Sequence, residues 1–200
     1  MRLFVAITAP AVVLEELEAA VAPLRSAWPG LSWTGRHAWH VTLAFLGEVG
    51  DDVAAALGPR LGRAAYRHPS LSLSFAGCGA FPGARRTRVL WTGVHGDQPA
   101  LTALARSVSA GARRAGAPPP DEGRPLRPHL TLARSRVPAD VSRLVEALAG
   151  YAGAPWAAAE IHLIRSHLGN TAWYETVGSW PLRRAAAGDG SGAGPAAPAG

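Results

Sequence analysis

Two short segments of the chain repeat the same residue types in the same order, and both carry side chains that can transfer protons. His40 is followed by Val-Thr-Leu-Ala-Phe-Leu-Gly, and His129 is followed by Leu-Thr-Leu-Ala-Arg. Alternation of polar and branched apolar residues predicts a β-strand for each segment. Residues i and i+2 of a strand point to the same face, so each segment presents an imidazole beside a hydroxyl, from Thr42 or Thr131.

Two imidazoles and two hydroxyls around one small space suit a phosphate group. Neutral donors hold its oxygens, and an acid and a base lie on opposite sides of the phosphorus. Histidine is suited to both roles because its ordinary pKa of about 6.5 allows one ring to be charged and the other neutral. One His-x-Thr segment carries little information, so the inference depends on the pair. The residues alone leave His40 and His129 interchangeable.

The elements around the two segments also follow one order twice. The spacing of apolar residues predicts a strand at 3–7, a helix at 9–28, the first motif strand and a helix from Asp51. A strand at 89–94, a helix at 101–112, the second motif strand and a helix from Pro138 repeat this order. We therefore expect an internal duplication, in which two lobes related by a pseudo-twofold axis each place one motif strand against a shared cleft.

The rest of the chain fits one domain over residues 1–184. A strand is predicted at 71–75, and a hairpin at 160–165 and 173–177. Residues 185–200 consist almost entirely of Ala, Gly, Pro and Ser, a composition that cannot bury a core, so a disordered tail is predicted. With 48% hydrophobic residues, the chain as a whole can build a sizeable core.

The charged residues favour anionic partners and exclude some reactions. The net charge is +6, and all 20 basic residues are arginines, which bind phosphate through paired N–H groups. Without lysine, the chain cannot form a Schiff base, a P-loop or a lysyl-nucleotide intermediate. Arginines lie at 85, 86 and 88, at 113 and 114, and at 124, 127, 134 and 136, and those flanking His129 are the ones expected to face the cleft.

Other sites and locations are less well supported. His37 and His40 would point to opposite faces of a strand, and no Cys pair or His-rich cluster completes a zinc shell, so no metal is expected. Cys78, between two glycines, is expected to be a buried small side chain and not a nucleophile. One cysteine and the absence of a cleavage site or a long apolar run predict a cytoplasmic protein without a membrane span.

Three tryptophans are candidates for stacking against nucleic-acid bases: Trp33, Trp39 and Trp173. Trp39 adjoins His40 in the sequence, so on a strand its ring should point away from the cleft.

The paired motifs resemble those of the two-histidine phosphoesterase superfamily. The chain is most similar to the RNA 2′,3′-cyclic phosphodiesterases once called 2′-5′ RNA ligases. Matching stretches include Arg2–Ile7, Gly79–Pro82, Arg88–Trp91 and Arg165–Gly169, and the likeness extends over residues 2–182. The resemblance implies an α+β fold with two lobes, in which antiparallel sheets face a central cleft.

The resemblance also implies the roles of the site residues. His40 would donate a proton to the 3′ oxygen and His129 would accept one from water, leaving a 2′-phosphomonoester. Thr42, Thr131 and Arg134 would bind the phosphate, with no cofactor or metal. The substrate would be RNA with a 2′,3′-cyclic phosphate end, and the reverse reaction would join RNA ends without ATP.

Two alternatives remain open. One is a phosphodiesterase for a small nucleotide such as an ADP-ribose cyclic phosphate, whose phosphate site would be the same. The other is a non-catalytic module that binds RNA ends, although binding alone would not require two titrating groups. The protein is expected to be a monomer.

Overall fold

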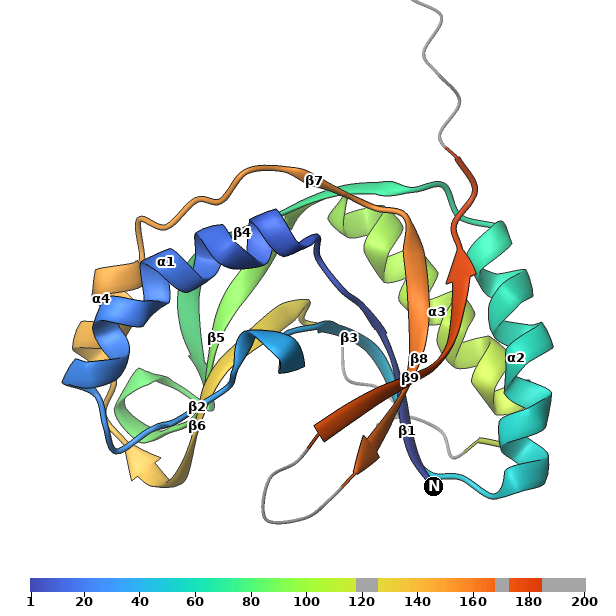
Figure 1. Ribbon diagram of the computed structural model, residues 1–200, viewed down its shortest axis with the longest axis horizontal. Coiled ribbons are helices and arrows are strands. Elements are labelled where there is room, and N and C mark those ends of the chain that lie inside the picture. Colours follow the sequence, from blue (N-terminus) through green and yellow to red (C-terminus); the bar gives the residue numbers. More distant parts are fainter. Residues whose placement is uncertain (118–125, 168–172, 185–200) are drawn as a thin grey trace, which may run out of the picture.

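The computed structural model describes residues 1–117, 126–167 and 173–184, and an antiparallel sheet lies at its centre (Figure 1). The predicted tail, 185–200, lies outside the described residues. The strands are β1 (Arg2–Ile7), β2 (Ser32–Trp33), β3 (Val41–Glu48), β4 (Leu71–Phe81), β5 (Thr87–Gly96), β6 (His129–Ala139), β7 (Trp156–Ala158), β8 (Glu160–His167) and β9 (Trp173–Pro181). The helices are α1 (Ala11–Ala27), α2 (Asp51–Tyr66), α3 (Gln98–Arg114) and α4 (Ser142–Leu148), with 3₁₀ turns at Arg36–Ala38 and Ala84–Arg86.

The sheet consists of two similar halves. The strand order is β7-β4-β5-β6-β3-β1-β8-β9, with β2 paired to β6. Each motif strand lies at the centre and pairs with the strand that precedes it in the duplicated order, β3 with β1 and β6 with β5. The predicted α+β duplication is therefore confirmed, and its two sheets are halves of one curved sheet.

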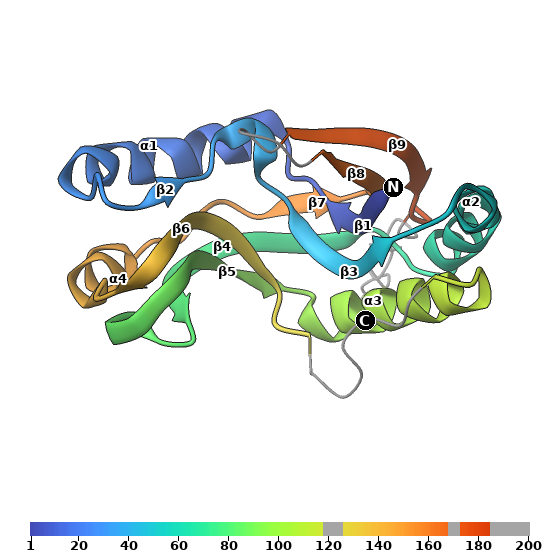
Figure 2. The same cartoon turned by 90° about the horizontal axis from the view of Figure 1, so that it is seen from below.

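The helices fall into two groups, one for each half of the sheet. α1 and α4 lie beside the half that contains β4, β5 and β6, whereas α2 and α3 lie beside the half that contains β8 and β9 (Figure 1). The view from below shows the same separation, with the motif strands β3 and β6 between the two groups (Figure 2). Each half thus has a helical layer, and the two halves meet at the motif strands.

β1 illustrates how the sheet separates two apolar layers. Leu3, Val5 and Ile7 belong to the main core, which also contains the buried faces of the helices. The alternate residues, Phe4 and Ala6, form a second small cluster with Ile164 of β8. Because successive side chains of a strand point to opposite faces, this second cluster lies on the side of the sheet away from the main core.

The sequence predicted most elements but not all of their boundaries. The predicted helix 9–28 corresponds to α1, and α2 begins at Asp51 as predicted. The helix predicted from Pro138 was wrong, since β6 continues to Ala139 and α4 begins at Ser142. The carboxylate of Asp140 accepts hydrogen bonds from the Ser142 N–H (3.0 Å) and hydroxyl (2.7 Å), which fixes the start of that helix. The short strands β2 and β7 were not predicted.

Candidate active site

The two motif strands meet at a single residue pair. Val41 of β3 pairs with Leu130 of β6 in antiparallel register. Continuing that register places His40 opposite Thr131, and Thr42 opposite His129. Each imidazole therefore lies near the hydroxyl of the other motif, and all four functional groups belong to one site.

Both motif strands contain a β-bulge at the same position. In β3 the pairing with β1 shifts between Thr42 and Ala44, so Leu43 is the extra residue. In β6 the pairing with β5 shifts between Thr131 and Ala133, so Leu132 is the extra residue. A bulge redirects the side chains that follow it, which brings the residue five positions after each histidine, Phe45 or Arg134, to the face that carries the threonine.

The two imidazoles are held in the same way. His40 Nδ1 lies 2.8 Å from the carbonyl oxygen of Ala38, and His129 Nδ1 lies 2.7 Å from that of Arg127. Because a carbonyl can only accept, Nδ1 carries the proton in each ring. Nε2 is then the nitrogen available to a substrate, as an acceptor in the neutral ring and as a donor in the charged one.

Aromatic rings surround each histidine. The ring of Phe4 lies 4.7 Å from that of His40, and Tyr174 meets His40 edge-on at 5.2 Å. In the other half, Phe81 meets His129 edge-on at 5.1 Å. These contacts fix both rings and remove water from around them.

Burial and positive charge lower the pKa of both histidines. Desolvation lowers the pKa of His40 to about 4, and the charges of Arg134 and His129 act in the same direction, whereas the hydrogen bond to Ala38 opposes them. The pKa of His129 is also lowered, by desolvation and then by Arg134, against its hydrogen bond to Arg127. Both rings are therefore neutral near pH 7 in the empty site, and an anion in the cleft would favour the charged form.

A cleft of about 510 Å³ contains both histidines, a volume in the range of small-molecule sites. All five predicted site residues line it: His40, Thr42, His129, Thr131 and Arg134. The sequence did not predict several other residues of the lining: Arg2, Phe4, Thr34, Phe45, Ser166 and Tyr174. These residues come mostly from strands that reach the site only through long-range pairing, which a local pattern does not reveal.

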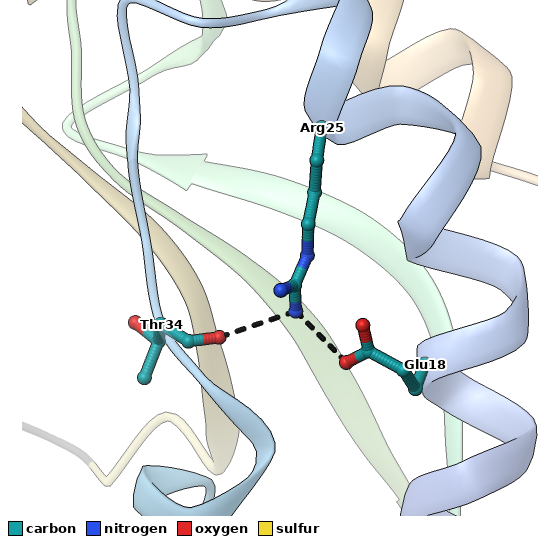
Figure 3. A network of polar contacts seen from close by, with 3 residues as sticks. All are labelled: Glu18, Arg25 and Thr34. Atoms are coloured by element: carbon teal, nitrogen blue, oxygen red, sulfur yellow. Dashed lines mark hydrogen bonds and ion pairs between the residues drawn. The ribbon is translucent and has the colours of Figure 1, made fainter.

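The segment with Thr34 is fixed from two sides. The Thr34 N–H donates to the carbonyl of the bulge residue Leu132 at 2.8 Å. On the other side, the Arg25 guanidinium of α1 donates to the Thr34 carbonyl at 3.4 Å and to the Glu18 carboxylate at 2.8 Å (Figure 3). This network ties α1 to the edge of the cleft and satisfies the carbonyl that the bulge removes from the ladder.

The three tryptophan candidates lie elsewhere. Trp39 is 2% exposed and belongs to the main core, as predicted for a ring that points away from the cleft. Trp33 does not line the cleft; its indole N–H donates to the Trp28 carbonyl at 3.1 Å. Trp173 is 51% exposed and stacks on His167 at 3.7 Å, next to the cleft residue Tyr174 but outside the lining.

Other candidate groups stay apart from this chemistry. Burial raises the pKa of the Cys78 thiol to about 11, so the thiol is protonated near neutral pH and is a poor nucleophile. Within residues 1–117, 126–167 and 173–184, no three His, Cys, Asp or Glu side chains are placed to hold a metal ion. None of the helices in that part of the chain is both long and apolar enough to span a membrane.

Known proteins share this sequence and fold. The family described as the 2′-5′ RNA ligase superfamily matches residues 13–170. An RNA 2′,3′-cyclic phosphodiesterase of Geobacillus stearothermophilus is 32% identical over 159 residues, which cover 78% of this chain and 49% of that protein. A protein of the same name from Aeropyrum pernix is 37% identical over 110 residues, covering 55% and 60%. The chain thus spans about half the length of these two relatives.

A solved structure agrees over nearly the whole chain. The crystal structure of E. coli LigT complexed with 3′-AMP has a TM-score of 0.71 and 28% identity, and covers 90% of this chain and 97% of that one. The match extends over both halves of the duplicated sheet and therefore over the strands that form the cleft. Together with the family match to residues 13–170, it shows that this chain belongs to the 2′-5′ RNA ligase superfamily.

Proposed function

We propose that the protein hydrolyses the 2′,3′-cyclic phosphate at an RNA end to a 2′-phosphomonoester, without a metal ion. The observation that carries the proposal is the identical orientation of two imidazoles in one cleft. The Nδ1–H of His40 and that of His129 each bind the carbonyl two residues earlier, at 2.8 and 2.7 Å. Two Nε2 atoms at one phosphate are what concerted acid and base catalysis requires.

The reaction needs one proton transfer at each end. His129 Nε2 takes a proton from water as the water oxygen bonds to phosphorus. The bond between phosphorus and O3′ breaks on the opposite side, and protonated His40 gives its Nε2 proton to O3′. The hydroxyls of Thr42 and Thr131 and the guanidinium of Arg134 bind the non-bridging oxygens, where negative charge must be stabilised.

The substrate itself supplies a condition for this mechanism. His40 has a pKa of about 4 in the empty cleft, so it is neutral before the substrate arrives. The cyclic phosphate carries a negative charge, and an opposite charge within a few ångströms raises the pKa of an imidazole. Substrate binding thus favours the protonated His40 that the reaction uses, and a neutral ligand would not.

Relatives support the choice of RNA. The Geobacillus and Aeropyrum proteins are named RNA 2′,3′-cyclic phosphodiesterases, and E. coli LigT was crystallised with 3′-AMP, a nucleotide with a phosphate on the ribose ring. The net charge of +6 favours an anionic polymer. We infer that the protein acts as a cytoplasmic monomer and that the same groups, run in reverse, support 2′-5′ ligation.

The test compares three substrates under single-turnover conditions: an oligonucleotide with a 2′,3′-cyclic phosphate end, 2′,3′-cyclic AMP and an ADP-ribose cyclic phosphate. We expect hydrolysis of the first two, with a higher kcat/KM for the oligonucleotide because further phosphates contact the basic surface. A higher kcat/KM for the ADP-ribose compound would indicate the small-nucleotide alternative. Binding of the oligonucleotide without turnover of any substrate would indicate a non-catalytic module.

A further inference from the structure

The two halves of the cleft differ at one pair of equivalent residues. Phe45 and Arg134 both stand five residues after their histidine, both follow the β-bulge, and both line the cleft. The duplication makes His40 and His129 equivalent in almost every respect, including their carbonyl partners. This pair of residues breaks that equivalence, with a flat apolar ring on one side and a planar cation on the other.

The side of the cleft with Phe45 presents an aromatic surface. Phe45 is 60% exposed, although large apolar side chains are usually covered. Its ring centroid lies 6.0 Å from that of Phe4, which in turn lies 5.5 Å from that of Tyr174. These three rings line the same cleft as the catalytic pair. A flat ring open to solvent on the cleft wall can therefore accept another planar group.

We propose that Phe45 is the platform on which the base of the terminal nucleotide stacks, while Arg134 faces the phosphate oxygens. The inference rests on the proposed function and adds the orientation of its substrate. Stacking on an aromatic ring tolerates every base because each has a π-face. Arginine in the equivalent position supplies the paired donors that match phosphate oxygens.

This orientation distinguishes the two histidines without reference to relatives. The oxygen that leaves phosphorus belongs to the same ribose as the base, and the attacking water must approach from the opposite side. A base on Phe45 places the nucleoside on the His40 side of the phosphate. His40 is then next to the leaving oxygen and donates the proton, whereas His129 faces the water and accepts one.

The test measures preference for a nucleoside in Phe45→Ala and Phe45→Trp. Two substrates are compared, 2′,3′-cyclic AMP and the base-free methyl riboside 2,3-cyclic phosphate. In Phe45→Ala the preference for the nucleotide, measured as the ratio of KM values, should fall roughly 5- to 150-fold, the range for loss of one base stack. Phe45→Trp should retain the preference. Tyr66→Ala removes an equally exposed aromatic ring on α2 and serves as the matched control.

A second readout does not depend on turnover. Calorimetry of adenosine 2′-phosphate and of ribose 2-phosphate should show a Kd for the nucleotide that rises by the same factor in Phe45→Ala, relative to the Kd for ribose 2-phosphate. An unchanged ratio in both experiments would overturn the platform, as would a change in oligomeric state on gel filtration, which would identify the ring as a contact between copies. If wild-type protein hydrolyses neither substrate but binding depends on Phe45, the proposed function fails and the base site stands.

Discussion

The burial of His40 should make the empty protein sensitive to acid. Its pKa is about 4 in the folded chain, against about 6.5 in an unfolded one. Between these values the unfolded chain binds more protons, so stability is lost as the pH falls below about 6.5, and the loss is complete below about 4. For a drop from pH 7.5 to 5, linkage gives a loss of about 2 kcal/mol from this residue.

Urea denaturation of wild type and His40→Gln at the two pH values measures this loss. The wild type should lose about 2 kcal/mol more than the variant, because glutamine does not titrate. His37→Gln, which replaces a nearby exposed histidine, should behave like wild type. Inorganic phosphate should reduce the wild-type loss at pH 5, since an anion in the cleft raises the pKa of His40. An equal loss in wild type and His40→Gln would refute this explanation of the shifted pKa.

Three further predictions concern the reaction. Activity should persist in excess EDTA, and complete loss restored by a divalent ion would replace the proposed mechanism with metal catalysis. The rate should be bell-shaped in pH, because His129 must be neutral and His40 protonated. The alkaline limb of kcat should lie at higher pH than that of kcat/KM, since the bound anion raises the pKa of His40; coincident limbs would contradict that role for the substrate. A 2′,3′-cyclic substrate with sulfur in place of O3′ has a leaving group that needs no acid, so it should restore His40→Ala much more than His129→Ala; equal effects on the two variants would contradict the assigned roles.

The sequence was sufficient for the functional groups and for the duplication. His40 with Thr42 and His129 with Thr131 are close in the sequence, and the two-residue period of a strand predicts their common face. The order of strands and helices also repeats clearly enough to predict two halves. Both inferences depend on local spacing, which a sequence displays directly.

The rest of the cleft depends on features that local spacing does not show. The extra residues Leu43 and Leu132 are ordinary apolar residues in an apolar run, so nothing marks them as bulges. Without a bulge, Phe45 would be assigned to the face opposite Thr42, and its place in the cleft was missed. Arg2 and Tyr174 reach the cleft through β1 and β9, at opposite ends of the chain, by pairings that only the folded sheet reveals.

The most direct test of the paired-histidine mechanism is the turnover of 2′,3′-cyclic AMP by wild type, His40→Ala and His129→Ala, followed by phosphorus NMR in EDTA. The wild type should convert the cyclic phosphate to the 2′-phosphate. Each variant should be slower by roughly 10² to 10⁴-fold, the contribution of one general acid or base, while remaining folded by circular dichroism. Turnover near the wild-type rate in either folded variant would show that the two histidines are not the acid and base of this cleft.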